Sequence, residues 1–204
     1  MHRDLQKEKN IQILVASSEH LQYAEAVCTL IEESAKIRGT GIAKRQPAYI
    51  RQKIKEGKAV IALTSEGQLA GFCYIESWGK NKDFIANSGL IVAPQFRHLG
   101  LAGLIKQATF TLSRKKFPQA KIFGITTSPA VMKINYNLGY RPVTFDQLTD
   151  DDDFWAGCAS CVNYDILQRT NRRHCLCTAM LYDPEEKKSK YKKEADYEES
   201  RISL

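Results

Sequence analysis

SGLIVAPQFRHLGLAGLIKQATFTLSRKKF, residues 88–117, contains a junction between a strand and a helix from which the rest of the chain can be interpreted. An apolar run ends at Val92 and a proline follows it, as is typical where a strand stops. From Leu101 onward, apolar residues recur at three- and four-residue spacing, which predicts an amphipathic helix that Pro118 ends. The residues expected on its inward side are Leu101, Leu104, Ile105, Ala108 and Leu112.

Two glycines and a small residue lie at this junction, namely Gly100, Ala102 and Gly103. The start of a helix exposes unpaired backbone N–H groups and the positive end of the helix dipole, so a glycine turn at this place predicts an anion site. The dinucleotide motif GxGxxG is absent from the sequence, and so is GxxxxGK followed by Ser or Thr. The sequence therefore supports neither a Rossmann fold nor a P-loop.

Predicted strands and helices follow one another around this junction. Strands are expected at 11–17, in two runs within 58–79 that form a hairpin, and at 84–92, 121–127, 140–145 and 175–182. Further helices are expected from Ser18 to near Gly39, over 47–56, and from Pro129 to near Gly139. This order predicts a mixed α/β fold built around one sheet.

Length and composition indicate one ordinary globular domain, with 204 residues of which 43% are hydrophobic and 26% charged. We expect a charged leader at 1–10, the domain at 11–183 with a cysteine-rich extension from about 146, and a charged, disordered tail at 184–204.

The distribution of apolar and charged residues indicates the cellular compartment and the kinds of binding partner. No stretch reaches the roughly 18 apolar residues of a membrane helix, and the first ten residues lack a signal-peptide core, so we expect a cytoplasmic protein without a membrane partner. The net charge of +7 suits an anionic ligand. Because no aromatic platform is interleaved with the basic residues, we expect no nucleic-acid partner.

Arg97, Gly100 and Ala102 form the pattern R-x-x-G-x-A after a strand and a proline. With this pattern, and with SPAVMKINYNLGYRPV at 128–143 as a second block, the chain resembles the GNAT superfamily of acyl-CoA N-acyltransferases over residues 11–145. The resemblance implies a mostly antiparallel sheet, splayed around acyl-CoA, with helices on both faces. It also implies direct attack of an amine on the thioester of acetyl-CoA or succinyl-CoA.

The resemblance assigns cofactor contacts to two neighbouring segments. Leu90 and Val92, on the strand before the junction, would hydrogen-bond the pantetheine arm. The coenzyme A pyrophosphate would be held by the loop residues Arg97, His98, Leu99, Gly100, Leu101, Ala102 and Gly103.

The catalytic pattern of the family is altered in this sequence. Where the family usually carries a tyrosine that protonates the departing thiolate, this chain has Asn135, and Tyr136 follows it. One residue rotates a side chain by about 100° around a helix, so Tyr136 as the acid and Asn135 as a hydrogen-bonding substitute are both open. Glu76 is the candidate general base, with an ordered water as the alternative.

The acceptor amine is expected near the loop IRGTGIAKR, whose Arg38, Lys44 and Arg45 suit a carboxylate. Asn87 and Ser88, on the strand before the junction, are further candidates for contact with the acceptor. The charges of Arg38, Lys44 and Arg45 are equally consistent with an ordinary exposed loop.

Several segments narrow the resemblance to a bacterial GNAT subgroup associated with arginine biosynthesis, which implies glutamate as the acceptor. These segments are ESAKIRGTGIAKR, GKAVIAL, GFCYIE, NSGLIVAP, and CVNYDIL with CLCTAMLYDP. A protein or peptide N-acetyltransferase and a non-catalytic acyl-CoA sensor are the alternatives. A homodimer is also left open.

Four of the six cysteines lie in two close pairs, Cys158 with Cys161 and Cys175 with Cys177. Four thiolates can close a tetrahedral zinc site, and alternate positions on a strand would put Cys175 and Cys177 on one face. The alternative is that they are small buried residues of the extension. A zinc ion here would be structural, without an open catalytic position.

Overall fold

The computed structural model describes residues 11–38 and 45–186. Its strands are β1 (Gln12–Val15), β2 (Ala59–Leu63), β3 (Leu69–Trp78), β4 (Phe84–Val92), β5 (Lys121–Thr126), β6 (Arg141–Val143) and β7 (Thr178–Tyr182). Its α-helices are α2 (Ala24–Arg38), α3 (Pro47–Lys55), α4 (Leu101–Lys116), α5 (Pro129–Asn137), α6 (Asp152–Ala156) and α7 (Tyr164–Arg169). Its 3₁₀ helices are η1 (Ser18–Tyr23), η2 (Pro94–Phe96) and η3 (Phe145–Gln147). The predicted leader, Lys44 and the tail from 187 lie outside the described residues.

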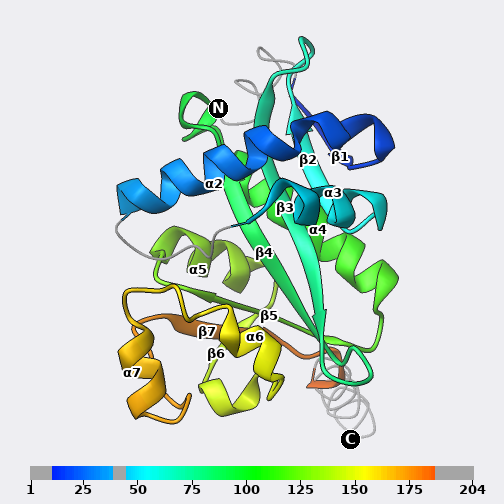
Figure 1. Ribbon diagram of the computed structural model, residues 1–204. Helices are drawn as coiled ribbons and strands as arrows, with labels where there is room; N and C mark the ends of the chain where they lie inside the picture. The colour runs from blue at the N-terminus through cyan, green and yellow to red at the C-terminus, as the bar shows by residue number, and fades with distance from the viewer. Residues whose placement is uncertain (1–10, 39–44, 187–204) are drawn as a thin grey trace, which may run out of the picture.

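The described strands form one seven-stranded sheet in the order β1-β2-β3-β4-β5-β7-β6. Every neighbouring pair is antiparallel except β4 and β5, which run parallel. Figure 1 shows α2 and α3 in front of strands β2 to β4, and α4 behind them. The predicted α/β fold, with a mostly antiparallel sheet and helices on both faces, is therefore confirmed.

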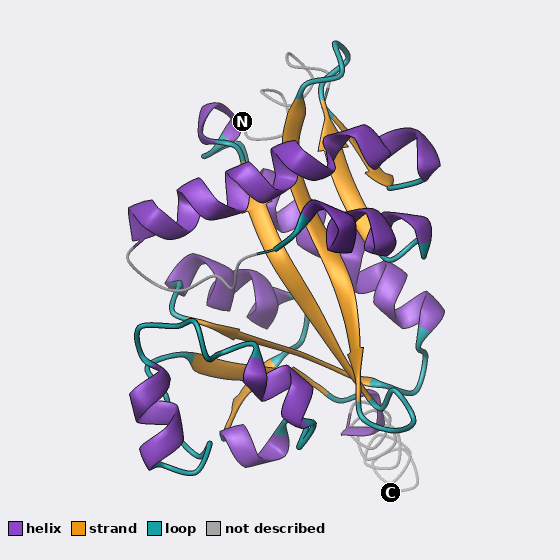
Figure 2. Ribbon diagram, viewed as in Figure 1, coloured by secondary structure: helices purple, strands orange, loops and turns teal. Residues whose placement is uncertain are grey.

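Strands β4 and β5 separate soon after they meet. They pair only at Phe84 with Lys121, Ile85 with Ile122 and Ala86 with Phe123. Beyond Ala86 the two strands diverge, and Figure 2 shows them meeting at one end and opening widely toward the other. Because β5 still pairs with β7 along its outer edge, the divergence leaves the facing edges of β4 and β5 without each other as hydrogen-bond partners.

The apolar core of the described residues has two parts. The larger part joins α2, α3 and α4 to strands β1 to β4 and includes Ile31, Ile54, Phe72 and Ile105. The smaller part packs the extension against β5 and β7, and its buried members include Phe123, Trp155 and Leu167. The extension is thus held by its own apolar cluster.

Helix α4 buries the predicted face except at Leu104, and it buries a row of polar residues as well. Leu104, expected inward, is 42% exposed, whereas Lys106, Thr109 and Ser113 are buried. The hydroxyl groups of Thr109 and Ser113 donate to carbonyls one turn earlier in the helix, each at 2.8 Å. Asn87 of β4 donates to Ser113 Oγ at 2.8 Å, so the sheet supplies polar partners for this face.

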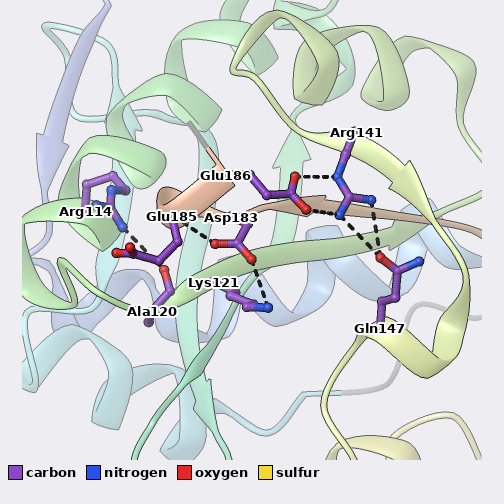
Figure 3. Close-up of polar contacts among 8 residues, drawn as sticks. All are labelled: Arg114, Ala120, Lys121, Arg141, Gln147, Asp183, Glu185 and Glu186. Atoms are coloured by element: carbon purple, nitrogen blue, oxygen red, sulfur yellow. Dashed lines mark hydrogen bonds and ion pairs between the residues drawn. The ribbon is translucent and has the colours of Figure 1, made fainter. Parts of the chain in front are cut away.

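The end of β7 is anchored by ion pairs to the neighbouring strands, as Figure 3 shows. Asp183 lies 2.9 Å from Lys121 Nζ of β5, and Glu186 accepts two hydrogen bonds from Arg141 of β6. These contacts tie the residues just past the last strand to the sheet. Among the described residues, no helix combines the length and the apolar character needed to cross a membrane.

Candidate functional site

The glycine junction is a helix start with exposed backbone donors. Gly100 is the N-cap of α4 and has a left-handed backbone with φ of +73°. A Cβ atom at Gly100 or Gly103 would meet no atom within 4 Å, so both glycines border open space. Among the described residues, the N–H groups of Gly100, Leu101 and Ala102 have no hydrogen-bond partner. This cluster of donors at a helix N-terminus is suited to phosphate oxygens.

The side chain of Arg97 makes two contacts that the sequence analysis did not predict. Its Nε donates to the Val92 carbonyl at 3.3 Å, and its Nη2 donates to Ser34 Oγ of α2 at 3.4 Å. Arg97 therefore fastens the end of β4 to α2. His98 is exposed and has a left-handed backbone with φ of +65°.

Strand β4 contains a bulge directly beside the divergence. Phe72 of β3 pairs with Ile91 while Tyr74 pairs with Ser88, so β4 has one residue more than β3 between these pairs. Gly89 lies in the bulge with φ of +64°, and a Cβ atom there would overlap the Tyr74 ring. The bulge turns the backbone of β4 at the point where it has left β5.

One cavity of about 540 Å³ occupies the divergence and reaches the extension. Its lining includes Asn87, Ser88, Gly89 and Leu90 of β4, Gly124, Ile125 and Thr126 of β5, Asn135 of α5 and Lys106 of α4. Its lining also includes Arg45, Tyr49, Glu76 and Trp78, and the four cysteines of the extension. This volume lies within the range of small-molecule sites in proteins, about 300–1,000 Å³.

Two buried polar atoms that line this cavity have no hydrogen-bond partner among the described residues. They are Trp78 Nε1, a donor, and Asn135 Oδ1, an acceptor. Buried polar groups are almost always hydrogen-bonded in folded proteins. Both atoms belong to residues that line the cavity, although the atoms themselves are covered.

Glu76 is a buried carboxylate at the wall of the cavity. It is only 6% exposed, and its Oε2 lies 2.9 Å from Lys53 Nζ of α3. Burial raises the pKa of Glu76 to about 7, although the Arg45 cation works in the opposite direction. Burial also lowers the pKa of Lys53. A carboxylate that titrates near neutral pH beside a cavity has the properties of a general base.

Solved structures provide the comparison for this arrangement, because no family model and no curated protein matches the sequence. The N-acetylglutamate synthase of Neisseria gonorrhoeae, complexed with coenzyme A and N-acetyl-glutamate, matches with a TM-score of 0.59 at 16% identity, over 85% of this chain and 35% of that chain. The Rv2747 protein of Mycobacterium tuberculosis, in complex with CoA, matches with a TM-score of 0.59 at 14% identity, over 84% and 98% of the two chains. A GNAT superfamily phosphinothricin acetyltransferase from Sinorhizobium meliloti, in complex with AcCoA, matches with a TM-score of 0.56 at 11% identity, over 85% of this chain and 88% of that chain.

The chain has the GNAT fold. It spans only about a third of the Neisseria synthase but nearly all of the Mycobacterium protein. The fold expected from the glycine junction and from the block at 128–143 is therefore confirmed. The diverging strands, the bulge in β4 and the glycine start of α4 are adjacent parts of one GNAT architecture.

Within this GNAT fold, α5 directs Asn135 inward and Tyr136 outward. Asn135 is 1% exposed and lines the cavity, and its Nδ2 lies 3.8 Å from Met180 Sδ of β7. Tyr136 is 70% exposed and does not line the cavity. The prediction that Tyr136 protonates a leaving group is corrected on this geometry, since consecutive residues of a helix point about 100° apart.

Arg45 is brought to the cavity beside the side chains of β3. It donates through Nε to the Tyr74 hydroxyl, and its guanidinium lies 5.8 Å from the centre of the Tyr49 ring. The other predicted acceptor contacts lie partly at the cavity and partly elsewhere. Asn87 and Ser88 line the cavity, Arg38 is the last residue of α2, and Lys44 is outside the described residues.

Lys106 is a cavity residue that the sequence analysis did not select. It lies on the inward face of α4, one turn from Thr109 and two turns from Ser113. A row of Lys, Thr and Ser at helical spacing, opposite an Asn on the strand before it, was the available signal. Apolar periodicity alone does not detect a polar buried face.

The four cysteines of the extension do lie at one wall of the cavity, but not as predicted. Strand β7 begins at Thr178, so Cys175 and Cys177 precede it rather than alternate along it. Burial and the neighbouring thiols raise the pKa of Cys158 to about 11 and that of Cys177 to about 12. Within residues 11–38 and 45–186, no group of three or more His, Cys, Asp or Glu side chains is arranged to hold a metal ion. The zinc prediction is not supported by this arrangement.

Proposed function

We propose that residues 11–183 form an acyl-CoA-dependent N-acyltransferase that transfers an acetyl or succinyl group to the amine of a small acidic acceptor, with glutamate as the leading candidate. The observation that carries the proposal is the cavity in the gap between β4 and β5, which is lined by a buried carboxylate, together with the glycine start of α4 that follows β4 in the chain. The structural neighbours with coenzyme A or acetyl-CoA bound support the same donor class.

The donor would occupy the gap between the strands. Unpaired N–H groups at the start of α4 suit the pyrophosphate, and the edge of β4 that β5 leaves beyond Ala86 suits the amides of a pantetheine arm. Acyl-CoA supplies an acyl group activated as a thioester. The buried acceptor atom of Asn135 is available to an N–H or S–H donor of this substrate.

The acceptor would occupy the side of the cavity between β3 and the segment before α3. Arg45 and the Trp78 N–H can each bind a carboxylate oxygen, and Glu76 lies on the same wall. The Neisseria synthase is complexed with N-acetyl-glutamate, which supports glutamate here. Because this chain spans 35% of that synthase, the activity of the whole synthase is carried over only as a proposal.

The chemistry assigned to the protein is general base catalysis followed by direct attack. Glu76 accepts a proton from the ammonium group of the acceptor, and the neutral amine attacks the thioester carbonyl carbon. Lys53 and Arg45 stabilise the charged form of Glu76 before the transfer. The apolar wall formed with Phe123 and Phe154 limits access of water to the reacting groups.

Release of free coenzyme A thiol tests this function directly. The protein is incubated with acetyl-CoA or succinyl-CoA and with glutamate, aspartate, neutral amino acids or a basic peptide. We expect release that depends on glutamate and a preference for one donor. Turnover with the peptide alone would indicate that the acceptor is a protein and not a small molecule. Tight coenzyme A binding without turnover would indicate a sensor.

A charge placed at the start of α4 should weaken donor binding. Gly103→Glu puts a carboxylate into open space, where like-charge repulsion should raise the Kd for coenzyme A about tenfold. Gly103→Gln is the matched control, because it has the same shape without the charge. Calorimetry at two salt concentrations measures both variants, and the difference should shrink at high salt. Equal Kd values for the two variants would exclude phosphate binding at this helix start.

Loss of Arg45 should act on the acceptor and not on the donor. Arg45→Gln is expected to raise the KM for glutamate by about tenfold or more, because it removes a charge-assisted contact to a carboxylate. The KM for acyl-CoA should stay unchanged. Arg51→Gln is the control, since Arg51 pairs with Glu25 at the surface and does not line the cavity. An unchanged KM for glutamate in Arg45→Gln would remove Arg45 from acceptor binding.

A further inference from the structure

Lys106 is a buried amine that reaches the cavity from the helix behind the sheet. Its side chain is 2% exposed, yet it lines the gap between β4 and β5. Its Nζ lies 3.5 Å from the Asn87 carbonyl oxygen and 5.5 Å from the centre of the Tyr140 ring. Among the described residues, no carboxylate forms an ion pair with it. The ammonium group therefore has hydrogen-bonding capacity left for a ligand in the gap.

The surroundings of Lys106 favour the release of a proton from its ammonium group. Burial lowers the pKa of Lys106 to about 8, and the Cys73 thiol of β3 opposes this shift. The other ionisable group that faces it is the Tyr140 hydroxyl, whose own pKa is raised by burial, so it stays neutral at physiological pH. Asn87, Thr109 and Ser113 complete this buried face with neutral groups.

A lysine at this place is poorly explained by packing alone. A buried ammonium without an anionic partner destabilises a fold, and an apolar side chain of similar length would fill the same volume. Asn135 also faces the gap, on the inward face of α5, and cannot supply a proton. Lys106 is thus the buried side chain on this part of the cavity wall that can give a proton to a leaving group near neutral pH.

We propose that Lys106 donates the proton that converts the departing thiolate of coenzyme A into a thiol. This inference rests on the proposed acyltransferase function and adds a catalytic residue to it. Asn135, with its unpaired Oδ1, holds the donor substrate beside it.

The proton balance of the step is complete with groups of the protein and water. After Glu76 has taken one proton from the acceptor ammonium, the amine nitrogen forms its bond to the thioester carbon. The C–S bond then breaks, its electron pair moves to sulfur, and Lys106 Nζ gives a proton to that sulfur. The second proton of the acceptor nitrogen passes to water, and the neutral Lys106 amine is reprotonated from water. Glu76 then gives its proton to water, so one proton is released overall.

The pH dependence of turnover distinguishes this role from a structural one. In the wild-type protein, kcat/KM should fall as the pH rises above about 8, because the donor must be protonated. Lys106→Met should lower kcat about 10- to 100-fold and abolish this basic limb. Lys106→Arg keeps the positive charge but does not release a proton at this pH, so it should also lack the basic limb.

Two further measurements separate catalysis from folding. Lys106→Met should keep the Kd for coenzyme A and melt no lower than the wild type, because it removes a buried unpaired charge. Lys115→Met, at an exposed position of the same helix, is the control and should keep the full pH profile. If the wild type is active and Lys106→Met keeps its basic limb, only the present inference is overturned. If the wild type releases no thiol with any amine, the proposed function fails and this inference fails with it.

Discussion

Glu76→Gln is expected to lower kcat by about 100-fold or more, because glutamine keeps the shape of the side chain but accepts no proton. The acceptor enters as an ammonium ion and has to lose a proton before its nitrogen can attack. Glu76 lies at the cavity wall, and burial gives it a pKa of about 7, close to the optimum for a base at neutral pH. Steady-state kinetics with saturating acyl-CoA measures the effect.

The pH profile should identify Glu76 as the base. In the wild-type protein, kcat/KM should rise with pH up to about 7, below the decline expected above about 8, because only the ionised carboxylate accepts a proton. This acid limb should be absent in Glu76→Gln. Lys53→Met should move the acid limb to higher pH, since removal of the ammonium 2.9 Å away disfavours the charged carboxylate.

Glu66→Gln is the control for this experiment. Glu66 lies in the exposed turn between β2 and β3, on the same hairpin as Glu76 but outside the cavity. Its kinetics and pH profile should equal those of the wild type. If Glu76→Gln retained both its kcat and its acid limb, an ordered water would replace Glu76 as the base.

Gly89→Ala is expected to lower the melting temperature by roughly 5 to 15 °C. A side chain at a left-handed position costs about 1–2 kcal/mol, and overpacking adds about 1–3 kcal/mol. Both penalties apply here, because Gly89 has φ of +64° and an added Cβ would overlap the Tyr74 ring. Tyr74 is fully buried, contacts Tyr49 edge-on and accepts a hydrogen bond from Arg45, so it cannot move aside.

Thermal melting followed by circular dichroism tests the prediction for Gly89. Gly103→Ala serves as the control, because a Cβ there meets no atom within 4 Å, and it should melt at or slightly above the wild-type temperature. Gly89→Ala should also bind coenzyme A more weakly below its melting point, since the bulge shapes the edge of β4. A wild-type melting temperature in Gly89→Ala would mean that β4 can relax around the added methyl group.

Local sequence patterns were sufficient for the strands and for the α-helices up to α5, whereas the short helices α6 and α7 of the extension were not predicted. Pro129 with Ser128 marks the start of α5, and the Ser128 side chain does accept a hydrogen bond from the Val131 N–H. Gly100 marks the start of α4 in the same way. Turn and capping residues act on the nearest few peptide groups, so their effect is visible in the sequence itself.

The inward faces of the helices depended on distant segments. Leu104 matches the apolar stripe of α4 but is exposed, because Asn87 of β4 offers polar partners to Lys106 and Ser113 instead. The choice between Asn135 and Tyr136 likewise depends on how α5 packs against Met180 of β7. Such choices are set by long-range packing, which a local pattern does not contain.

The sequence by itself therefore determined the order of the elements and the glycine helix start, and through its resemblance to the GNAT superfamily it pointed to the fold. Only the tertiary structure decided which side chains line the cavity. It paired Glu76 with Lys53 from another element, turned Tyr136 outward and brought Lys106 through the gap between β4 and β5. The physical reason is that burial and electrostatic partners, which tune the chemistry of these groups, come from residues far apart in the chain.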